Sequence, residues 1–215
     1  LVAQINTQRL LDIGRNALYF EDYIVAIQNF NQVIKAKPYL TEPYLFRAVA
    51  KLNLEDYYGA ISDCDAALEI NPFLPKVYYC RGYAYRQLGE LEKSTEDFKK
   101  SLEFDPNNIN TGCLMIENMI RQEKTDEALL ACENLIQEYP GHVNTYILRS
   151  QIYLAQQDTT LALMDLDSAI VHNKFADLPY AIRGMVKYSQ KDYNSALEDL
   201  NSAIRLNLFR ADYFG

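Results

Sequence analysis

Apolar residues recur three and four positions apart over most of the chain, as they do at Ala60, Ile61, Cys64, Ala67 and Leu68. This spacing places apolar side chains on one face of an α-helix, whereas a half-buried strand needs strict alternation. The apolar stretches are about 14 residues long and are separated by short polar turns. The pattern therefore predicts an all-α protein built from short antiparallel helix pairs.

The helical pattern itself repeats at a fixed interval. Prolines stand 34 residues apart at Pro38, Pro72, Pro106 and Pro140. A proline cannot continue a helix, so each one predicts the end of a helix pair. Six frames fit without a gap, namely 7–40, 41–74, 75–108, 109–142, 143–176 and 177–210. We expect residues 1–6 to be a lead-in and residues 211–215 to start a seventh repeat or a capping helix.

Two positions in the frames, numbered 1 to 34, are nearly always small. Position 20 is Ala or Ser in all six frames, and position 8 is small in five of them. Small side chains allow two helices to approach closely, so these positions predict helix contacts within each frame. Frame four departs from the pattern, because Ile116 occupies position 8 and Gly112 replaces the usual aromatic residue. We therefore expect the helix near 109–122 to pack differently.

The recurring positions resemble the signature of the tetratricopeptide-repeat (TPR) family, W-x2-L-G-x2-Y followed by A-x3-F and P. Frame three matches it best, through Tyr78, Gly82, Tyr85, Ser94, Phe98 and Pro106. The resemblance covers residues 7–210. It implies a right-handed superhelical solenoid of helix pairs and a non-catalytic scaffold that binds proteins or peptides.

Composition and charge narrow the function further. The 215-residue chain carries a net charge of −8, which argues against general binding to nucleic acid. No stretch approaches 18 consecutive apolar residues, so no membrane span is expected. The four cysteines lack C-x-x-C spacing, and we interpret them as small apolar residues rather than metal ligands or disulfide partners.

The first residues bear on localisation. Leu1-Val2-Ala3 resembles the tail of a cleaved secretory signal, which favours a bacterial periplasm or cell envelope. The alternative is an arbitrary start and a cytoplasmic protein.

Catalysis has little support in the sequence. The only two histidines, His142 and His172, fall near the ends of second helices, about 30 residues apart, and we interpret them as solvated. None of the common motifs of metalloproteases, serine hydrolases or phosphate-binding loops occurs. We expect no enzymatic activity, no cofactor and no metal site.

Arginine and aspartate occur together at positions 7 and 23 of frames two, three, five and six, and frames one and four lack both. One interpretation is a row of arginines that binds an anionic ligand. We favour the other, an ion pair between the two helices of a frame, because a partly buried guanidinium needs a partner of matching geometry. The pairs are Arg47 with Asp63, Arg81 with Asp97, Arg149 with Asp165, and Arg183 with Asp199.

The TPR resemblance also implies a binding groove lined by positions 2, 5, 9, 12 and 13 of each frame. The partner-binding residues expected from these positions are Arg15, Tyr19, Asn53, Lys76, Tyr79, Tyr83, Arg86, Glu117 and Arg121. We expect the groove to be centred on Tyr79, Tyr83, Arg86 and Arg121, because Tyr and Arg dominate interface energetics. The alternative is that the two tyrosines only pack neighbouring helices.

A carboxylate clamp, which some TPR proteins use to hold chaperone C-termini, is not expected here. In the family this clamp looks like a Lys at position 5 and an Asn at position 9, and no frame here has either residue at those positions. The leading function is therefore a protein- or peptide-binding scaffold of another specificity. The alternatives are a structural self-assembly module, whose open ends stack, and an accessory repeat domain of a larger protein.

Overall fold

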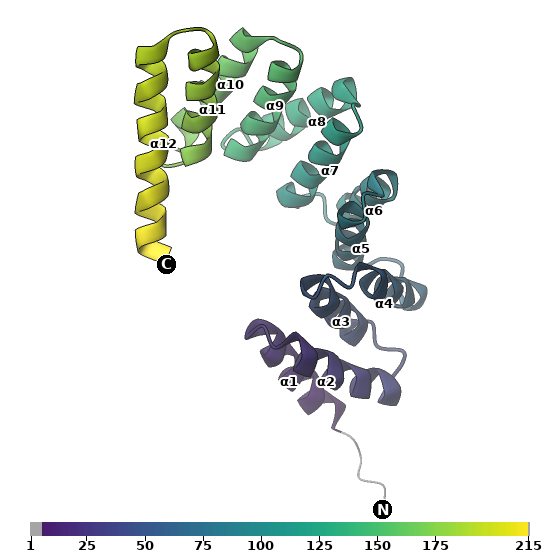
Figure 1. Ribbon diagram of the computed structural model, residues 1–215. Helices are drawn as coiled ribbons and strands as arrows, with labels where there is room; N and C mark the ends of the chain where they lie inside the picture. The colour runs from purple at the N-terminus through teal and green to yellow at the C-terminus, as the bar shows by residue number, and fades with distance from the viewer. Residues whose placement is uncertain (1–5, 215) are drawn as a thin grey trace, which may run out of the picture. The chain divides into compact units, whose positions relative to one another are not determined.

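The computed structural model describes residues 6–214, and side chains up to residue 208, so the signal-like start Leu1-Val2-Ala3 lies outside the described residues. Within this range the chain is helical and contains no strand (Figure 1). The helices are α1 Thr7–Tyr19, α2 Tyr23–Ala36, α3 Glu42–Asn53, α4 Tyr57–Ile70, α5 Pro75–Gln87, α6 Leu91–Phe104, α7 Ile109–Arg121, α8 Thr125–Glu138, α9 Val143–Ala155, α10 Thr159–His172, α11 Asp177–Ser189 and α12 Tyr193–Phe214.

The helices follow the sequence periodicity. Each predicted frame contributes two consecutive helices, so the twelve helices of residues 6–214 fit six tandem repeats. The first helix of a repeat starts at the first or second residue of its frame, and the second helix follows after a three-residue turn. None of these described helices is both long and apolar enough to cross a membrane.

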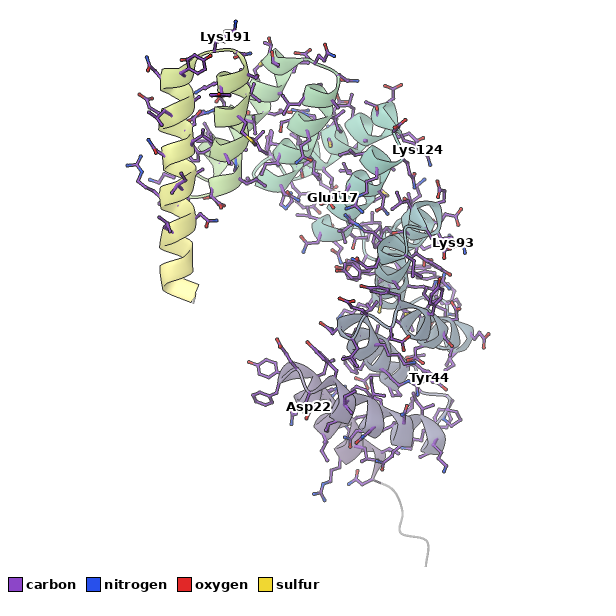
Figure 2. The ribbon with its side chains drawn as sticks, viewed as in Figure 1. Asp22, Tyr44, Lys93, Glu117, Lys124 and Lys191 are labelled. Carbon is purple, nitrogen blue, oxygen red and sulfur yellow. The ribbon has the colours of Figure 1, made fainter. Side chains whose placement is uncertain are left out.

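The turns inside the repeats share one backbone conformation. The fifteenth residue of every repeat has a positive φ of 58–77°, at Glu21, Glu55, Gly89, Glu123, Gln157 and Lys191. The next residue caps the following helix, and an aspartate side chain accepts a backbone N–H in four repeats, as Asp56 does from Gly59 at 2.9 Å. Asp22, Lys124 and Lys191 mark three of these turns in Figure 2. A left-handed residue followed by a cap thus reverses the chain in each repeat.

Compact packing divides the molecule into two units, one up to Asn118 and one from Met119 onward. In the first unit, the small positions allow the close helix contacts that were predicted. A Cβ added to Gly82 would lie 2.9 Å from two ring carbons of Phe98, which is fully buried. Ala48, Ala60 and Cys64 are likewise fully buried in one cluster with their neighbours.

The second unit repeats this packing. Its core contains Tyr146, Ile147, Leu166, Ala169 and Ile182 from α9, α10 and α11. Gly184 would place an added Cβ 2.9 Å from Leu200 and 3.1 Å from the carbonyl oxygen of Ala196. Gly82 and Gly184, both at position 8, therefore allow a close helix approach in their own units.

Frame four fills its positions differently. Ile116 is fully buried on α7. Asn118, two residues further along α7, is also fully buried and donates a 2.8 Å hydrogen bond to Ser94 Oγ of α6. A bulky apolar residue and an amide thus replace the small residue used elsewhere, and a changed pitch of this helix stays a prediction.

The last helix departs from the expected frame boundary. A new element was expected to start at residue 211, but α12 continues without a break from Tyr193 to Phe214. Leu208 stands where the first four frames have proline, and leucine keeps both its backbone N–H and its helical geometry. The boundary at residue 210 therefore lies inside a helix.

Candidate functional site

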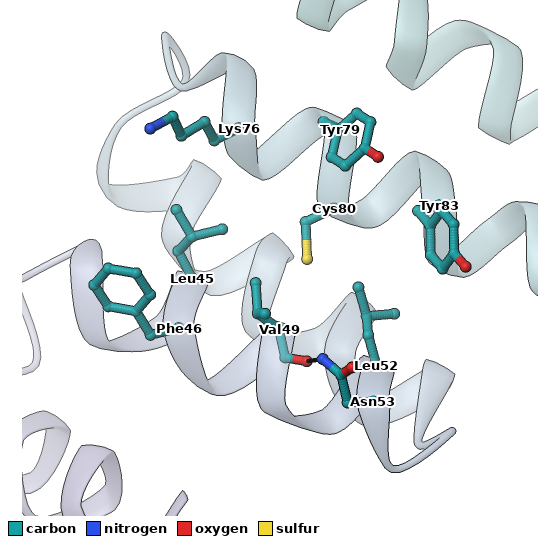
Figure 3. Close-up of a pocket in the computed structure, with 9 residues that line it drawn as sticks. All are labelled: Leu45, Phe46, Val49, Leu52, Asn53, Lys76, Tyr79, Cys80 and Tyr83. Carbon is teal, nitrogen blue, oxygen red and sulfur yellow. Dashed lines mark hydrogen bonds between the residues drawn. The ribbon is translucent and has the colours of Figure 1, made fainter. Parts of the chain in front are cut away.

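The first unit contains a groove between the first helices of its second and third repeats. Its volume is about 610 Å³, within the range of ligand-binding pockets. Helix α3 contributes five lining residues and α5 contributes four (Figure 3). They are Leu45, Phe46, Val49, Leu52 and Asn53 from α3, and Lys76, Tyr79, Cys80 and Tyr83 from α5.

The helical repeat explains why these side chains face one another. Leu45, Val49 and Leu52 are spaced four and three residues apart, so they share one face of α3. Lys76, Tyr79 and Tyr83 are spaced three and four residues apart, so they share one face of α5. Figure 3 places Lys76 near the Leu45 end of the groove, and Tyr83 near the Leu52 end.

The groove is apolar along its length, and its lining includes one cation. Lys76 is exposed and makes no ion pair with any described residue. Tyr79 is half-buried against Phe98, with ring centroids 6.0 Å apart, and burial together with the neighbouring Tyr83 raises the pKa of its phenol. Asn53 is engaged within the protein, since it donates to the carbonyl of Val49 at 2.8 Å and accepts from Tyr23 at 3.3 Å.

Two ion pairs flank this groove and join successive first helices. Arg15 of α1 binds Glu42 of α3, and its guanidinium lies 5.3 Å from the ring centre of Phe46. Arg86 of α5 binds Glu117 of α7 at 2.6 Å, and its side chain is only 9% exposed. Two of the three predicted groove arginines are therefore engaged within the protein, which leaves Lys76 as the exposed cation of the groove lining.

Two predicted groove residues lie elsewhere. Tyr19 is 82% exposed and packs edge-to-face on Phe20, outside the groove lining. Arg121 is exposed near the end of α7 and belongs to the second unit. Conversely, Phe46 and Cys80 line the groove without having been predicted. Both occupy position 6 of their frames, which lies on the same helix face as positions 2 and 9.

The structure brings together every predicted arginine–aspartate pair. Each arginine donates two hydrogen bonds to both carboxylate oxygens of its aspartate at 2.5–2.9 Å, in the bidentate geometry that guanidinium favours. The four aspartates are 3–5% exposed. The pairs are Arg47–Asp63, Arg81–Asp97, Arg149–Asp165 and Arg183–Asp199.

Three of these arginines also reach the preceding repeat. Arg47 donates to Asn31 at 2.5 Å, Arg81 to Asp65 at 2.7 Å, and Arg183 to Asp167 at 2.5 Å. Their hydrogen-bonded aspartates raise the pKa of Arg81 and Arg183, so both guanidiniums stay charged. These arginines are consequently committed to holding helices and repeats together.

Two of the four aspartates are contacted by a second cation, and two are not. Lys51 contacts Asp63 at 2.9 Å, and Lys187 contacts Asp199 at 2.8 Å, whereas Tyr85 and Tyr153 occupy this position in the third and fifth repeats. Burial raises the pKa of Asp97 despite its hydrogen bonds from Arg81. Burial acts on Asp199 in the same direction, but hydrogen bonds from Arg183 and Lys187 outweigh it and lower the pKa. Lys187 thus supplies Asp199 with a second hydrogen bond that lowers its pKa, and Asp97 has no counterpart of it.

Comparison with known families identifies the architecture. The model of the family described as tetratricopeptide repeat matches residues 75–108, which are the third helix pair. The twelve helices of residues 6–214 have the fold of a tetratricopeptide-repeat solenoid. No curated protein matches the chain significantly.

Solved structures place the whole array in the TPR fold. A TPR protein from Parabacteroides merdae has a TM-score of 0.72 at 21% identity, covering 95% of this chain and 80% of that one. YrrB, described as a TPR protein with an unusual peptide-binding site, has a TM-score of 0.63 at 17% identity, covering 82% of this chain and 91% of its own. At these identities both show the fold alone.

A third TPR structure carries a ligand. The first TPR of Spaghetti (RPAP3), solved with the HSP90 peptide SRMEEVD, is 27% identical with a TM-score of 0.54. The match covers 54% of this chain and 93% of that one.

Among residues 6–214 of the present chain, no group of three or more His, Cys, Asp or Glu side chains could hold a metal ion.

Proposed function

We propose that this TPR chain is a non-catalytic scaffold and that the α3–α5 groove binds a segment of another protein. The observation that carries the proposal is the apolar groove of about 610 Å³ between α3 and α5. Its walls combine partly buried aliphatic side chains with Tyr79 and Tyr83, and tyrosine is enriched at the centres of protein interfaces. Such a groove fits one or two apolar side chains of a peptide.

The charges around the groove indicate what flanks those apolar side chains. Lys76 is the exposed cation at one end, whereas Arg15 and Arg86 already hold Glu42 and Glu117. A peptide with an acidic residue on the Lys76 side of its apolar anchor is therefore favoured. This contribution is small, about 0.2–1 kcal/mol, because Lys76 is exposed. Peptide affinity should come mainly from burial of the anchor, and should depend only weakly on salt.

The peptide ligand can be selected from random sequences. A phage-displayed random dodecapeptide library is selected on the wild-type chain, and the enriched peptides are synthesised with one added tryptophan. The chain contains no tryptophan, so fluorescence of the peptide reports binding directly. We expect Tyr83→Ala and Val49→Glu to weaken binding at least about 30-fold, which corresponds to roughly 2 kcal/mol at an interface hot spot.

Tyr188→Ala is the matched control, because Tyr188 is a 62% exposed tyrosine on the first helix of the sixth repeat. It should leave peptide affinity unchanged. Circular dichroism of each variant tests whether the helices are intact. A library that yields no peptide would overturn the proposal. So would peptides whose affinity is unaffected by both groove variants in folded protein.

A further inference from the structure

Four large apolar side chains are exposed at the turns inside the first and second repeats. We define the turn patch as Phe20, Ile24, Leu54 and Tyr58, which occupy positions 14 and 18 of their frames. They are between 43% and 77% exposed. None of them lines the α3–α5 groove. The turn patch is therefore a second apolar surface of the first unit.

The fold does not require apolar residues at these positions. In the fourth, fifth and sixth repeats position 14 is glutamine, and position 18 is Asp126, Thr160 or Asn194. Those turns have the same length and the same positive φ at position 15. The second repeat also has a repeat on either side, so Leu54 and Tyr58 are not exposed for want of a neighbouring repeat. An exposed apolar surface that the core does not use points to a binding role.

The two halves of the turn patch lie next to each other. The hydroxyl of Tyr23 donates a 3.3 Å hydrogen bond to Oδ1 of Asn53. Tyr23 directly precedes Ile24, and Asn53 directly precedes Leu54. The hydrogen bond therefore holds the first turn beside the second and joins their apolar side chains into one surface.

Carboxylates surround the turn patch. Two exposed acids follow position 14 in both repeats, and none of the four makes an ion pair with any described residue. They are Glu21, Asp22, Glu55 and Asp56. Lys93 of the third repeat is close enough to Tyr58 to interact with it electrostatically, but it is already bound to Glu90 at 2.5 Å. The apolar surface is therefore bordered by negative charge, which attracts a cationic partner.

We propose that the turn patch binds a segment of another protein in which apolar residues are bordered by Arg or Lys. Burial of the partner's apolar side chains supplies affinity, and a guanidinium can pair with a turn carboxylate while it stacks on Phe20 or Tyr58. A second copy of this chain that met the patch with its own patch would bring the same carboxylates to the contact. Nucleic acid and anionic membranes would be repelled for the same reason.

Fluorescence of a designed peptide tests the proposal on the 215-residue chain, which contains no tryptophan. The probe is a synthetic dodecapeptide with a central Leu-Trp-Leu anchor, two arginines on each side and serine elsewhere. Its counterpart has glutamate in place of every arginine. We expect the arginine peptide to bind at least about tenfold more tightly than its counterpart, and to lose affinity as salt is raised.

Residues taken from other repeats can remove the patch without straining the turns. Phe20→Gln and Tyr58→Thr introduce side chains that the fifth repeat has at positions 14 and 18. Glu21→Gln and Glu55→Gln are compatible in the same way, since Gln157 has the same positive φ at position 15. The variant F20Q/Y58T should weaken binding of the arginine peptide at least about tenfold, and E21Q/E55Q about threefold.

Two controls separate this site from other causes of binding. E123Q/E127Q removes two exposed carboxylates from the fourth repeat, and Tyr83→Ala alters the α3–α5 groove. Both should leave the affinity of the arginine peptide unchanged, with circular dichroism to establish that each variant is folded.

Three results would overturn the proposal. The first is an arginine peptide that binds the wild type no more tightly than its glutamate counterpart. The second is an affinity that folded F20Q/Y58T leaves unchanged. The third is a control that weakens binding as much as the patch variants do. A loss in E123Q/E127Q would indicate general attraction to an acidic protein, and a loss in Tyr83→Ala would place the peptide in the groove.

Discussion

The third and sixth repeats have the same interior and different surfaces. Both hold a bidentate arginine–aspartate pair, Arg81–Asp97 or Arg183–Asp199, that also reaches the preceding repeat. Both use glycine at position 8 against a large side chain of the second helix. These shared residues lie where helices meet, so they set the fold of each repeat and say little about its partners.

The surfaces diverge at the positions that face away from these contacts. The third repeat places Tyr79 and Tyr83 on the wall of the α3–α5 groove, whereas the sixth repeat has Ala181 and Met185 at those positions. The second helix of the third repeat buries Thr95, whereas the sixth repeat exposes Leu197 at the same position. Repeats with the same interior thus carry different residues at their surfaces.

Replacing the arginine should produce the largest difference in stability loss between the two repeats. Arg81→Leu removes the cation that pairs with the buried carboxylate of Asp97, and we expect a loss of about 3–5 kcal/mol in the free energy of unfolding. Arg183→Leu should cost less, because Lys187 still contacts Asp199 at 2.8 Å. Urea unfolding followed by circular dichroism measures both.

The difference between these variants should vanish when the lysine is removed as well. The double variant R183L/K187L leaves Asp199 as isolated as Asp97 is in R81L, so the two should lose similar free energy. Equal losses for R81L and R183L alone would show that Lys187 gives no support. The third and sixth repeats would then not differ in how strongly cations stabilise their buried aspartates.

Added methyl groups at position 8 should have a smaller effect. The Cβ of Gly82→Ala would meet Phe98, which is fully buried and cannot move aside, so we expect a destabilisation of about 1–3 kcal/mol. The Cβ of Gly184→Ala would meet Leu200, which is only partly buried, and would lie 3.1 Å from the carbonyl oxygen of Ala196. The better helix propensity of alanine should offset part of this strain. Thermal unfolding midpoints compare the two, and a larger loss for G184A would contradict this account.

Much of this architecture could be predicted from the sequence, because the physical requirement recurs in each repeat. The 34-residue spacing of proline predicts the helix ends, and the joint occurrence of Arg and Asp predicts their contact. The left-handed turn residues were missed, since five of the six are Glu, Gln or Lys rather than glycine. Nothing in such a side chain indicates a positive φ, which is imposed by the packing of the two helices that it joins.

The site was predicted less completely than the fold. The TPR resemblance implied that positions 5, 9 and 12 line the groove, which holds for Leu45, Val49 and Leu52, and their helical spacing puts all three on one face of α3. The pairing of Arg15 with Glu42, and of Arg86 with Glu117, was missed. Whether such residues meet depends on the distance and angle between successive first helices, which a one-dimensional pattern does not contain.

Acidification should change the stability contributions of the two aspartates in opposite directions, and this is the smallest of the expected effects. The pKa of Asp199 is lowered in the folded chain, so its contribution to stability is present above the unfolded value and is lost as pH falls through the folded pKa. The pKa of Asp97 is raised, so folding is favoured as pH falls through that value. The destabilisation caused by Asp199→Asn should therefore shrink between about pH 7 and pH 3, whereas that caused by Asp97→Asn should grow. Urea midpoints of each variant and of the wild type, measured across this range, give the two slopes. Slopes of equal sign would mean that Lys187 does not distinguish the sixth repeat from the third.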